Sequence, residues 1–144
     1  MNIKVQKVNP SACLPTRGSR EAAGYDLYAC IEEAVEIPPH ETRTIDTGLR
    51  FELPSGYFAG IFARSGIASR EGLRPANCVG ICDADYRGNY MVALHNDSDC
   101  VRTVTPREKI AQMVVMPFLE LEFDVQEELT ETERGEGGFG STGA

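Results

Sequence analysis

The sequence lacks the long apolar runs that a membrane-spanning segment requires. A transmembrane helix needs about 20 consecutive, mostly apolar residues, and no run in these 144 residues approaches that length. Residues 1–8 alternate polar and apolar side chains, where a signal peptide would need an unbroken apolar stretch. We therefore expect a soluble protein that is not exported and has no membrane partner.

Cysteine patterns for disulfides or metal binding are also missing. The five cysteines are an odd number and include no Cys-x-x-Cys pair, which argues against a disulfide framework and against a zinc site. The two histidines, His40 and His95, do not stand beside a cysteine or carboxylate at the spacing of metal ligands. These features suit a reducing cytoplasm, and we expect a cytoplasmic protein.

An excess of positive charge is absent as well. The chain has 14 Lys and Arg against 22 Asp and Glu, so its formal net charge is −8 at pH 7. Proteins that bind nucleic acid without sequence preference depend on surplus Lys and Arg, and we expect no nucleic-acid partner. A ligand that carries phosphates would need local arginines or a metal ion to overcome the negative field of the whole chain.

Hydrophobic residues make up 42% of the chain and charged residues 25%, which is typical of one globular domain with a buried core. Short stretches with apolar residues at alternate positions recur between turn residues, a pattern typical of β-strands. They cover residues 3–8, 25–29, 34–37, 49–53, 57–63, 90–94, 101–104 and 110–116. Only Ser65–Leu73 could be helical, and its two glycines limit it to a turn or short helix. We predict an all-β sandwich or barrel of many short strands.

The C-terminal part differs in composition. We expect residues 1–125 to form the β core and residues 126–144 to form an acidic arm with a flexible glycine-rich tail. Seven of the fifteen residues from Glu120 to Arg134 are acidic, as in a solvated segment. The last eleven residues contain five glycines around a few polar and aromatic groups: Arg134, Phe139, Ser141 and Thr142. Such a tail could close over a phosphorylated ligand that bears a ring; a frayed terminus is the alternative.

The densest group of reactive side chains lies between Gly80 and Gly88. Asp83 and Asp85 stand two positions apart in a strand-like stretch, so their side chains point to the same side, and Tyr86 follows at once. One carboxylate could activate a water molecule, while the tyrosine offers a flat packing face. A hairpin that uses Asp and Gly only for turn geometry is the alternative interpretation.

Two further groups could bind phosphate. Arg64, Ser65 and Gly66 place a bidentate cation, a hydroxyl and an unhindered backbone N–H in succession. A strand end followed by a Ser-Gly turn would have the same sequence. Asp26 and Gln112 are single polar groups among apolar neighbours. Each of these signals is weak when it is taken alone.

Taken together and in this order, the segments resemble the five motifs of the trimeric deoxyuridine triphosphatases, the dUTPases. The matches span nearly the whole chain: residues 23–27, 64–66, 80–88, 110–112 and 134–143. Five ordered matches are far more specific than a single glycine-rich string. The resemblance implies a jelly-roll-like β fold, a homotrimer with active sites at subunit interfaces, and hydrolysis of dUTP to dUMP and pyrophosphate with Mg2+. Such an activity would lower dUTP and supply dUMP for thymidylate synthesis.

The resemblance also implies a role for each matching residue. Asp83 would activate the water that attacks the α-phosphorus, and Tyr86 would pack on the deoxyribose and leave no space for a 2′-hydroxyl. Backbone groups at the hairpin positions Asn77, Gly80, Ile81 and Met91 would read the uracil edge, and Cys82 beside Asp83 would also contact the substrate. The triphosphate would be bound by Arg64, Ser65, Gly66 and Gln112. The tail would contribute γ-phosphate contacts and a ring stacked on uracil, from Arg134, Phe139, Gly140, Ser141 and Thr142. No direct protein ligand to Mg2+ is expected, only water-mediated contacts from Asp26 and Gln112.

The sequence departs from the family pattern at three positions. Ala63 stands where a proline often precedes the motif arginine, Cys82 replaces an aliphatic residue, and Lys109 replaces an arginine. The last change loses a bidentate fork but keeps the charge. Two other functions remain alternatives. One is a dCTP deaminase of the same fold, which needs a differently placed glutamate that we do not find, and the other is a catalytically silent nucleotide-binding module.

Overall fold

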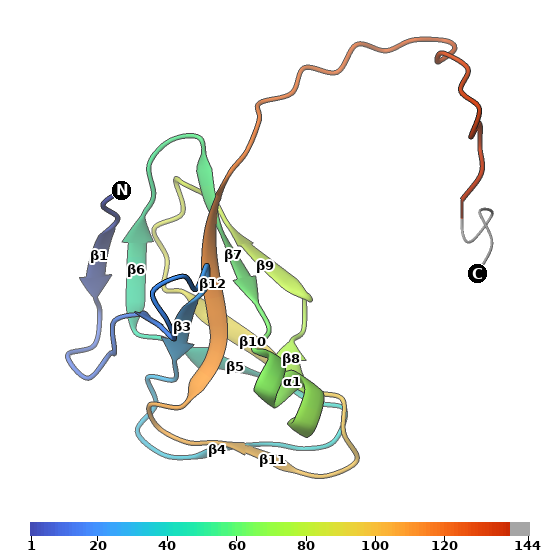
Figure 1. Ribbon diagram of the computed structural model, residues 1–144. Coiled ribbons are helices and arrows are strands. Elements are labelled where there is room, and N and C mark those ends of the chain that lie inside the picture. The colour runs from blue at the N-terminus through green and yellow to red at the C-terminus, as the bar shows by residue number, and fades with distance from the viewer. Residues whose placement is uncertain (139–144) are drawn as a thin grey trace.

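The computed structural model describes residues 1–138 and contains twelve short strands and one short helix in this range (Figure 1). The strands are β1 (Lys4–Lys7), β2 (Thr16–Arg17), β3 (Tyr25–Tyr28), β4 (Val35–Ile37), β5 (Thr42–Asp46), β6 (Leu49–Glu52), β7 (Tyr57–Phe62), β8 (Leu73–Pro75), β9 (Val79–Cys82), β10 (Met91–Asn96), β11 (Arg102–Val104) and β12 (Lys109–Pro117). The helix, α1, covers Ser65–Glu71. The prediction of an all-β fold with at most a short helix after residue 64 is confirmed.

The strands form one large sheet and three smaller ones. The large sheet has the order β2-β3-β12-β7-β9, and a second sheet has the order β5-β10-β8. Two further pairs, β1-β6 and β11-β4, complete the set, and every strand pair among residues 1–138 is antiparallel. In Figure 1, β5 and β10 cross behind β3 and β12. Sheets stacked in this way are the arrangement expected of a jelly-roll-like fold.

Side chains from both larger sheets make the hydrophobic core. Leu27 on β3, Ile110 on β12, and Ile45 and Leu94 on the second sheet are all at most 1% exposed. In β10, buried and partly exposed residues alternate, as the period of a strand with one buried face requires. The core therefore fixes the positions of β3, β9 and β12, which carry Asp26, Gly80–Cys82 and Gln112 of the predicted site, and of β7, which leads to Arg64.

The chain leaves the core after β12. Residues 118–138 contain no strand or helix, and Figure 1 shows them running away from the sheets. Apolar and acidic residues alternate in the first part, and the apolar ones are strongly exposed: Leu119 (83%), Leu121 (68%), Phe123 (90%) and Val125 (92%). We call residues 118–138 the arm. The helix α1 has seven residues, and no helix within residues 1–138 is long and apolar enough to cross a membrane.

Candidate active site

A pocket of about 260 Å³ lies at the turn between β9 and β10. Its walls come from β7, β8, β9, β10 and the connecting turn: Ile61, Pro75, Asn77, Gly80, Ile81, Cys82, Asp83, Tyr86, Asn89, Tyr90, Met91, Val92 and Ala93. We call it the hairpin pocket. Seven residues predicted from the sequence line it, namely Asn77, Gly80, Ile81, Cys82, Asp83, Tyr86 and Met91. The pocket thus combines an exposed carboxylate, an exposed aromatic ring and backbone polar groups in one concave site, the usual form of a small-molecule site.

Tyr86 is held over the turn by a chain of hydrogen bonds. Its hydroxyl donates to the backbone carbonyl of Asn89 at 3.2 Å. The Asn89 amide accepts from Arg50 Nε at 2.8 Å and donates to Asp46 Oδ2 at 3.0 Å. Asp46 belongs to β5 and Arg50 to β6. These hydrogen bonds therefore anchor the ring of Tyr86, although almost half of the residue is exposed. A flat, fixed ring is well suited to select the shape of a sugar.

Tyr90 forms the floor beneath this ring. It is 2% exposed, and its ring centroid lies 6.1 Å from that of Tyr86 and 4.6 Å from that of Phe51. Burial raises the pKa of Tyr90 far above its ordinary value of 10.0, with a further contribution from Cys82. Among the residues that the structure describes, its buried hydroxyl has no hydrogen-bond partner. The Cys82 thiol lies close enough to influence its ionisation, but the pair lacks the geometry of a hydrogen bond.

Cys82 also lines the hairpin pocket. Burial raises the pKa of its thiol, and the charge of Asp83 adds to this effect, while Tyr90 opposes it. Since the thiolate is the nucleophilic form of cysteine, a raised pKa keeps this side chain unreactive near neutral pH. The side chain acts here as a small apolar group.

A second group of polar residues lies where β3, β7 and β12 come together. Asp26 on β3 accepts from Arg64 Nε through Oδ1 and from Lys109 Nζ through Oδ2, both at 2.8 Å. Partial burial alone would raise the pKa of Asp26, but hydrogen bonds from Lys109 and Arg64 outweigh burial and lower it below 3.8. Lys109 therefore donates to one carboxylate oxygen of Asp26 from a single ammonium group, whereas an arginine could donate two parallel hydrogen bonds. With Gln112 these residues form what we call the polar cluster.

Gln112 is fixed from two sides. The register pairs Gln112 on β12 with Asp26 on β3 and with Phe62 on β7. Its side-chain amide donates to the backbone carbonyl of Ala63 at 2.8 Å, directly before the motif arginine. The cluster thus places the end of β7, and with it Ser65 and Gly66 at the start of α1, beside Asp26. Of the sequence-predicted phosphate group, Asp26, Arg64, Ser65, Gly66 and Gln112 lie together.

The structure does not bring all predicted residues into one site. None of the residues predicted to bind phosphate lines the hairpin pocket. Arg134 lies on the arm, exposed, with Nε donating to the carbonyl of Gly137 at 2.8 Å. The predicted tail residues Phe139, Gly140, Ser141 and Thr142 lie outside the described residues. Within one chain, the residues predicted to contact base and sugar therefore line a different part of the surface from those predicted to contact phosphate.

Metal coordination by side chains alone is not available in the described part of the chain. No group of three or more His, Cys, Asp or Glu side chains within residues 1–138 could hold a metal ion. Both carboxylate oxygens of Asp26 already accept from cations, so this residue is poorly placed as a direct ligand. A divalent ion at this site would need oxygen ligands from a bound phosphate and from water.

Comparison with known proteins decides the family. Residues 11–143 match the family model described as dUTPase. The chain belongs to the dUTPase family. Relatives in this family are similar over their full lengths: a deoxyuridine 5′-triphosphate nucleotidohydrolase from Nautilia profundicola is 44% identical over 143 residues, which is 99% of each chain. One of the same name from Polynucleobacter asymbioticus is 45% identical over 144 residues, 99% of this chain and 97% of the relative.

Solved dUTPase structures have the same fold. The dUTPase of Staphylococcus bacteriophage 80alpha, solved with dUPNHPP, superposes with a TM-score of 0.90 at 29% identity and covers 99% of both chains. A mutant dUTPase from phage phi11 of S. aureus, described with a structural Mg(II) ion, has a TM-score of 0.77 at 26% identity and covers 89% of this chain and 98% of its own. The predicted family and the jelly-roll-like fold are confirmed.

Sequence reasoning missed several residues of the hairpin pocket. Pro75, Asn89 and Tyr90 line the hairpin pocket, and Asn89 anchors the Tyr86 ring. The signal for Asn89 and Tyr90 was their position directly after the dense segment that ends at Gly88. No pattern in the sequence pointed to Pro75, because its place in the pocket follows from the pairing of β8 with β10.

Proposed function

We propose that this chain is a dUTP diphosphatase that hydrolyses dUTP to dUMP and pyrophosphate. The observation that carries the proposal is the hairpin pocket, in which Asp83 and Tyr86 share one concave site with Asn77, Gly80 and Ile81. The dUTPase family and full-length relatives named as dUTP nucleotidohydrolases support the same reaction. Its place in the cell is the cytoplasm, where it lowers dUTP and supplies dUMP.

Each part of the pocket has a role in this proposal. The backbone of Gly80 and Ile81 and the amide of Asn77 contact the uracil edge, with Met91 beside them. Tyr86 packs against the deoxyribose, so that a 2′-hydroxyl would collide with the ring. The Tyr86 hydroxyl donates a hydrogen bond to the Asn89 carbonyl. The ring therefore cannot easily move to make room for a 2′-hydroxyl.

Asp83 is the general base. Its carboxylate accepts a proton from a water molecule as the water oxygen bonds to the α-phosphorus, and the bond from this phosphorus to the bridging oxygen breaks. Pyrophosphate leaves with the electron pair of that bond. The reaction demands little covalent chemistry from the protein, so positioning and charge neutralisation carry most of the rate acceleration.

The polar cluster binds the triphosphate. Arg64, Ser65, Gly66 and Gln112 contact phosphate oxygens, and Gln112 and Asp26 would accept hydrogen bonds from water molecules around the metal. Mg2+ bound to the phosphates would supply charge neutralisation during the hydrolysis. These side chains suit a metal ion that is bound through phosphates and water. Asp26 already accepts hydrogen bonds from Arg64 and Lys109, and Gln112 offers a neutral carbonyl oxygen.

Assembly as a homotrimer would complete each site. In one chain the hairpin pocket and the polar cluster are separate, so a second copy is needed to place phosphate groups beside the base-binding pocket. The arm supports this part of the proposal. Its exposed apolar residues alternate along an extended segment, and contact with another subunit would bury them. Arg134, Gly140, Ser141, Thr142 and Phe139 would then reach a neighbouring subunit's nucleotide, at the γ-phosphate and uracil.

A release assay tests the activity. The protein with Mg2+ is given dUTP, dTTP, dCTP or UTP separately, and pyrophosphate and ammonia are both measured. We expect pyrophosphate from dUTP far above the other three, and activity that falls when a chelator removes the metal. Ammonia from dCTP without pyrophosphate from dUTP would identify the deaminase alternative. Nucleotide binding without either product would identify a catalytically silent module.

A further inference from the structure

We propose that Arg74 is a positioning residue for base recognition, because it supports the turn that carries Asn77 into the hairpin pocket. The inference rests on the proposed function, since Asn77 is the residue assigned there to the uracil edge. Arg74 itself does not line the pocket. It acts through the backbone of residues 75–78, which we call the Asn77 turn.

The Asn77 turn has a conformation that needs support. The Cys78 N–H donates to the carbonyl of Pro75 at 3.0 Å and closes a four-residue turn. Cys78 has φ of 61°. This left-handed conformation is unfavourable in free energy for any residue other than glycine. Asn77 lies between these two residues, and its amide nitrogen sits so close to Gly80 that a Cβ there would lie 3.2 Å from it. A small movement of the turn would therefore move Asn77 relative to the β9 backbone.

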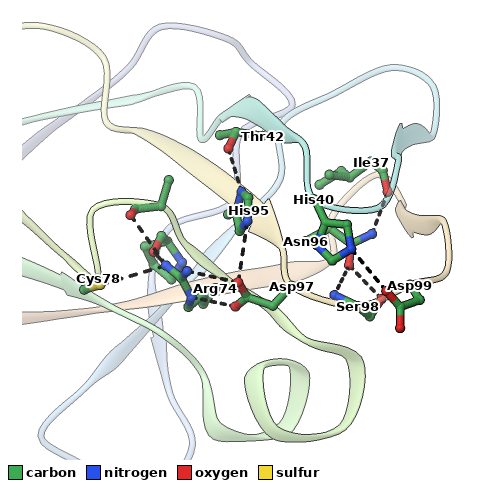
Figure 2. Close-up of polar contacts among 12 residues, drawn as sticks. Ile37, His40, Thr42, Arg74, Cys78, His95, Asn96, Asp97, Ser98 and Asp99 are labelled. Atoms are coloured by element: carbon green, nitrogen blue, oxygen red, sulfur yellow. Dashed lines mark hydrogen bonds and ion pairs between the residues drawn. The ribbon is translucent and has the colours of Figure 1, made fainter.

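One edge of the Arg74 guanidinium holds this turn. Its Nη1 donates to the carbonyl of Pro75 at 3.2 Å and to the carbonyl of Ala76 at 3.5 Å, and it lies 3.8 Å from Cys78 Sγ. Figure 2 shows the side chain of Arg74 between Cys78 and Asp97. A single cationic group thus contacts three of the four residues of the turn.

The other edge of the guanidinium is fixed by a carboxylate. Asp97 accepts from Arg74 Nε at 2.6 Å and from Nη2 at 3.0 Å, a bidentate arrangement that fixes direction as well as distance. His95 Nε2 lies 3.5 Å from Asp97, and His95 Nδ1 lies 3.0 Å from the Thr42 hydroxyl. The contacts in Figure 2 therefore run from β5 across β10 to the Asn77 turn.

The ion pair between Arg74 and Asp97 contributes little to the free energy of unfolding of the whole chain. The side chains of Arg74 and Asp97 are 35% and 44% exposed, and ion pairs with this exposure contribute little to the free energy of unfolding. The hydrogen bonds from Arg74 lower the pKa of Asp97, so the pair stays ionised in neutral solution. Removing Arg74 should consequently affect nucleotide recognition more than folding.

The test compares Arg74→Met with Arg43→Met in the full chain. Arg43 on β5 forms a half-exposed ion pair with Glu41 at 2.6 Å and does not contact the Asn77 turn, so it is a matched control for the lost charge. We expect Arg74→Met to raise KM for dUTP about tenfold with kcat within about twofold, and to reduce the preference for dUTP over dCTP. Arg74→Lys should fall between wild type and Arg74→Met, because a lysine cannot bridge Asp97 and the turn. Thermal unfolding should shift equally little in Arg74→Met and Arg43→Met.

The outcomes separate this proposal from the proposed function. If wild type releases no pyrophosphate from dUTP, the proposed function is wrong. If wild type is active and Arg74→Met matches Arg43→Met in KM and in base preference, the role of Arg74 is refuted. A large loss of thermal stability confined to Arg74→Met, with KM and base preference unchanged in the protein that remains folded, would assign Arg74 to folding and also refute it.

Discussion

Gly24 and Gln112 pack directly against each other, so that a Cβ on Gly24 would clash with the Gln112 side-chain oxygen. The contact matters because the other end of the same amide donates to the carbonyl of Ala63. Gly24 therefore leaves the room in which Gln112 ties β12 to the end of β7. The glycine acts on the polar cluster without contributing a functional group to it.

Replacing Gly24 with alanine should displace Gln112 and reduce activity. Overpacking of this kind costs about 1–3 kcal/mol, and a displaced Gln112 should lower kcat/KM for dUTP by roughly tenfold or more. Gly18→Ala is the matched control, because apart from Gly18 and its chain neighbours no described atom lies within 4 Å of a Cβ at that position. Steady-state kinetics and thermal unfolding of the two variants check the prediction, and equal activity would show that Gln112 has no such role.

Asp83 and Asp85 differ in their relation to the hairpin pocket. Only Asp83 lines it, so Asp83→Asn should lower kcat by about 10²–10⁴-fold while dUTP still binds. Asp85→Asn makes the same chemical change two residues away and should retain most of the activity. Single-turnover rates and binding by calorimetry compare the two. If Asp85→Asn loses more turnover than Asp83→Asn, the general base has been misassigned.

The ring of Tyr86 should decide between dUTP and UTP. Tyr86→Ala removes the surface that collides with a 2′-hydroxyl, so the ratio of kcat/KM for dUTP over UTP should fall by roughly tenfold or more. Tyr86→Phe keeps the ring and loses only the hydrogen bond to Asn89, so it should retain most of the discrimination. Undiminished discrimination in Tyr86→Ala would exclude sugar selection by this ring.

Acid should weaken the polar cluster in a defined pH range. The pKa of Asp26 is lowered below 3.8 in the folded chain, because Lys109 and Arg64 outweigh burial. A lowered pKa contributes stability that is fully present above the unfolded value and is lost as pH falls through the folded value. In urea unfolding between about pH 5 and pH 2, Asp26→Asn should show a shallower loss of unfolding free energy than wild type.

Lys109→Met provides the companion measurement. It removes one of the two cations that lower the pKa of Asp26, so its acid dependence should lie between those of wild type and Asp26→Asn. An identical slope for all three proteins would show that Asp26 does not titrate differently in the folded and unfolded states.

Removal of residues 134–144 should leave the β core folded and eliminate most activity. The truncated chain loses Arg134 and Phe139 but keeps the arm up to residue 133, so assembly should be unaffected. We expect kcat/KM for dUTP to fall by roughly tenfold or more, with an unchanged elution volume on size exclusion. Full activity after truncation would assign the tail no role in catalysis.

Much of the fold could be predicted because the strands that make the core have a clear alternating pattern. β10 carries buried residues such as Val92 and Leu94 at alternate positions, and β12 carries the buried apolar residues Ile110, Ala111 and Met113. β5 contains a single buried apolar residue, Ile45, and was not predicted. Likewise β8 has only three residues and includes Pro75. Such strands are defined by their pairing partners, which local sequence does not encode.

The candidate site was predictable only as separate groups. The order of the motifs predicted Arg64, Asp83 and Gln112 as site residues, but nothing in the sequence placed Gln112 opposite both β3 and β7. Arg74 and Asp97 are 23 residues apart and meet because β8 pairs with β10. Contacts of this kind depend on strand register, and register follows from packing of the whole sheet.

The acidic arm has a consequence for how the protein behaves in solution. Eight of the 22 acidic residues and one of the 14 basic residues follow residue 119, so residues 1–119 carry a formal charge of only −1 out of −8. Electrostatic repulsion between molecules, which keeps a protein soluble, thus comes almost entirely from the C-terminal segment. Residues 1–119 are nearly neutral, so they repel a highly charged anion only weakly, while the negative charge of the C-terminal segment still keeps the molecules apart.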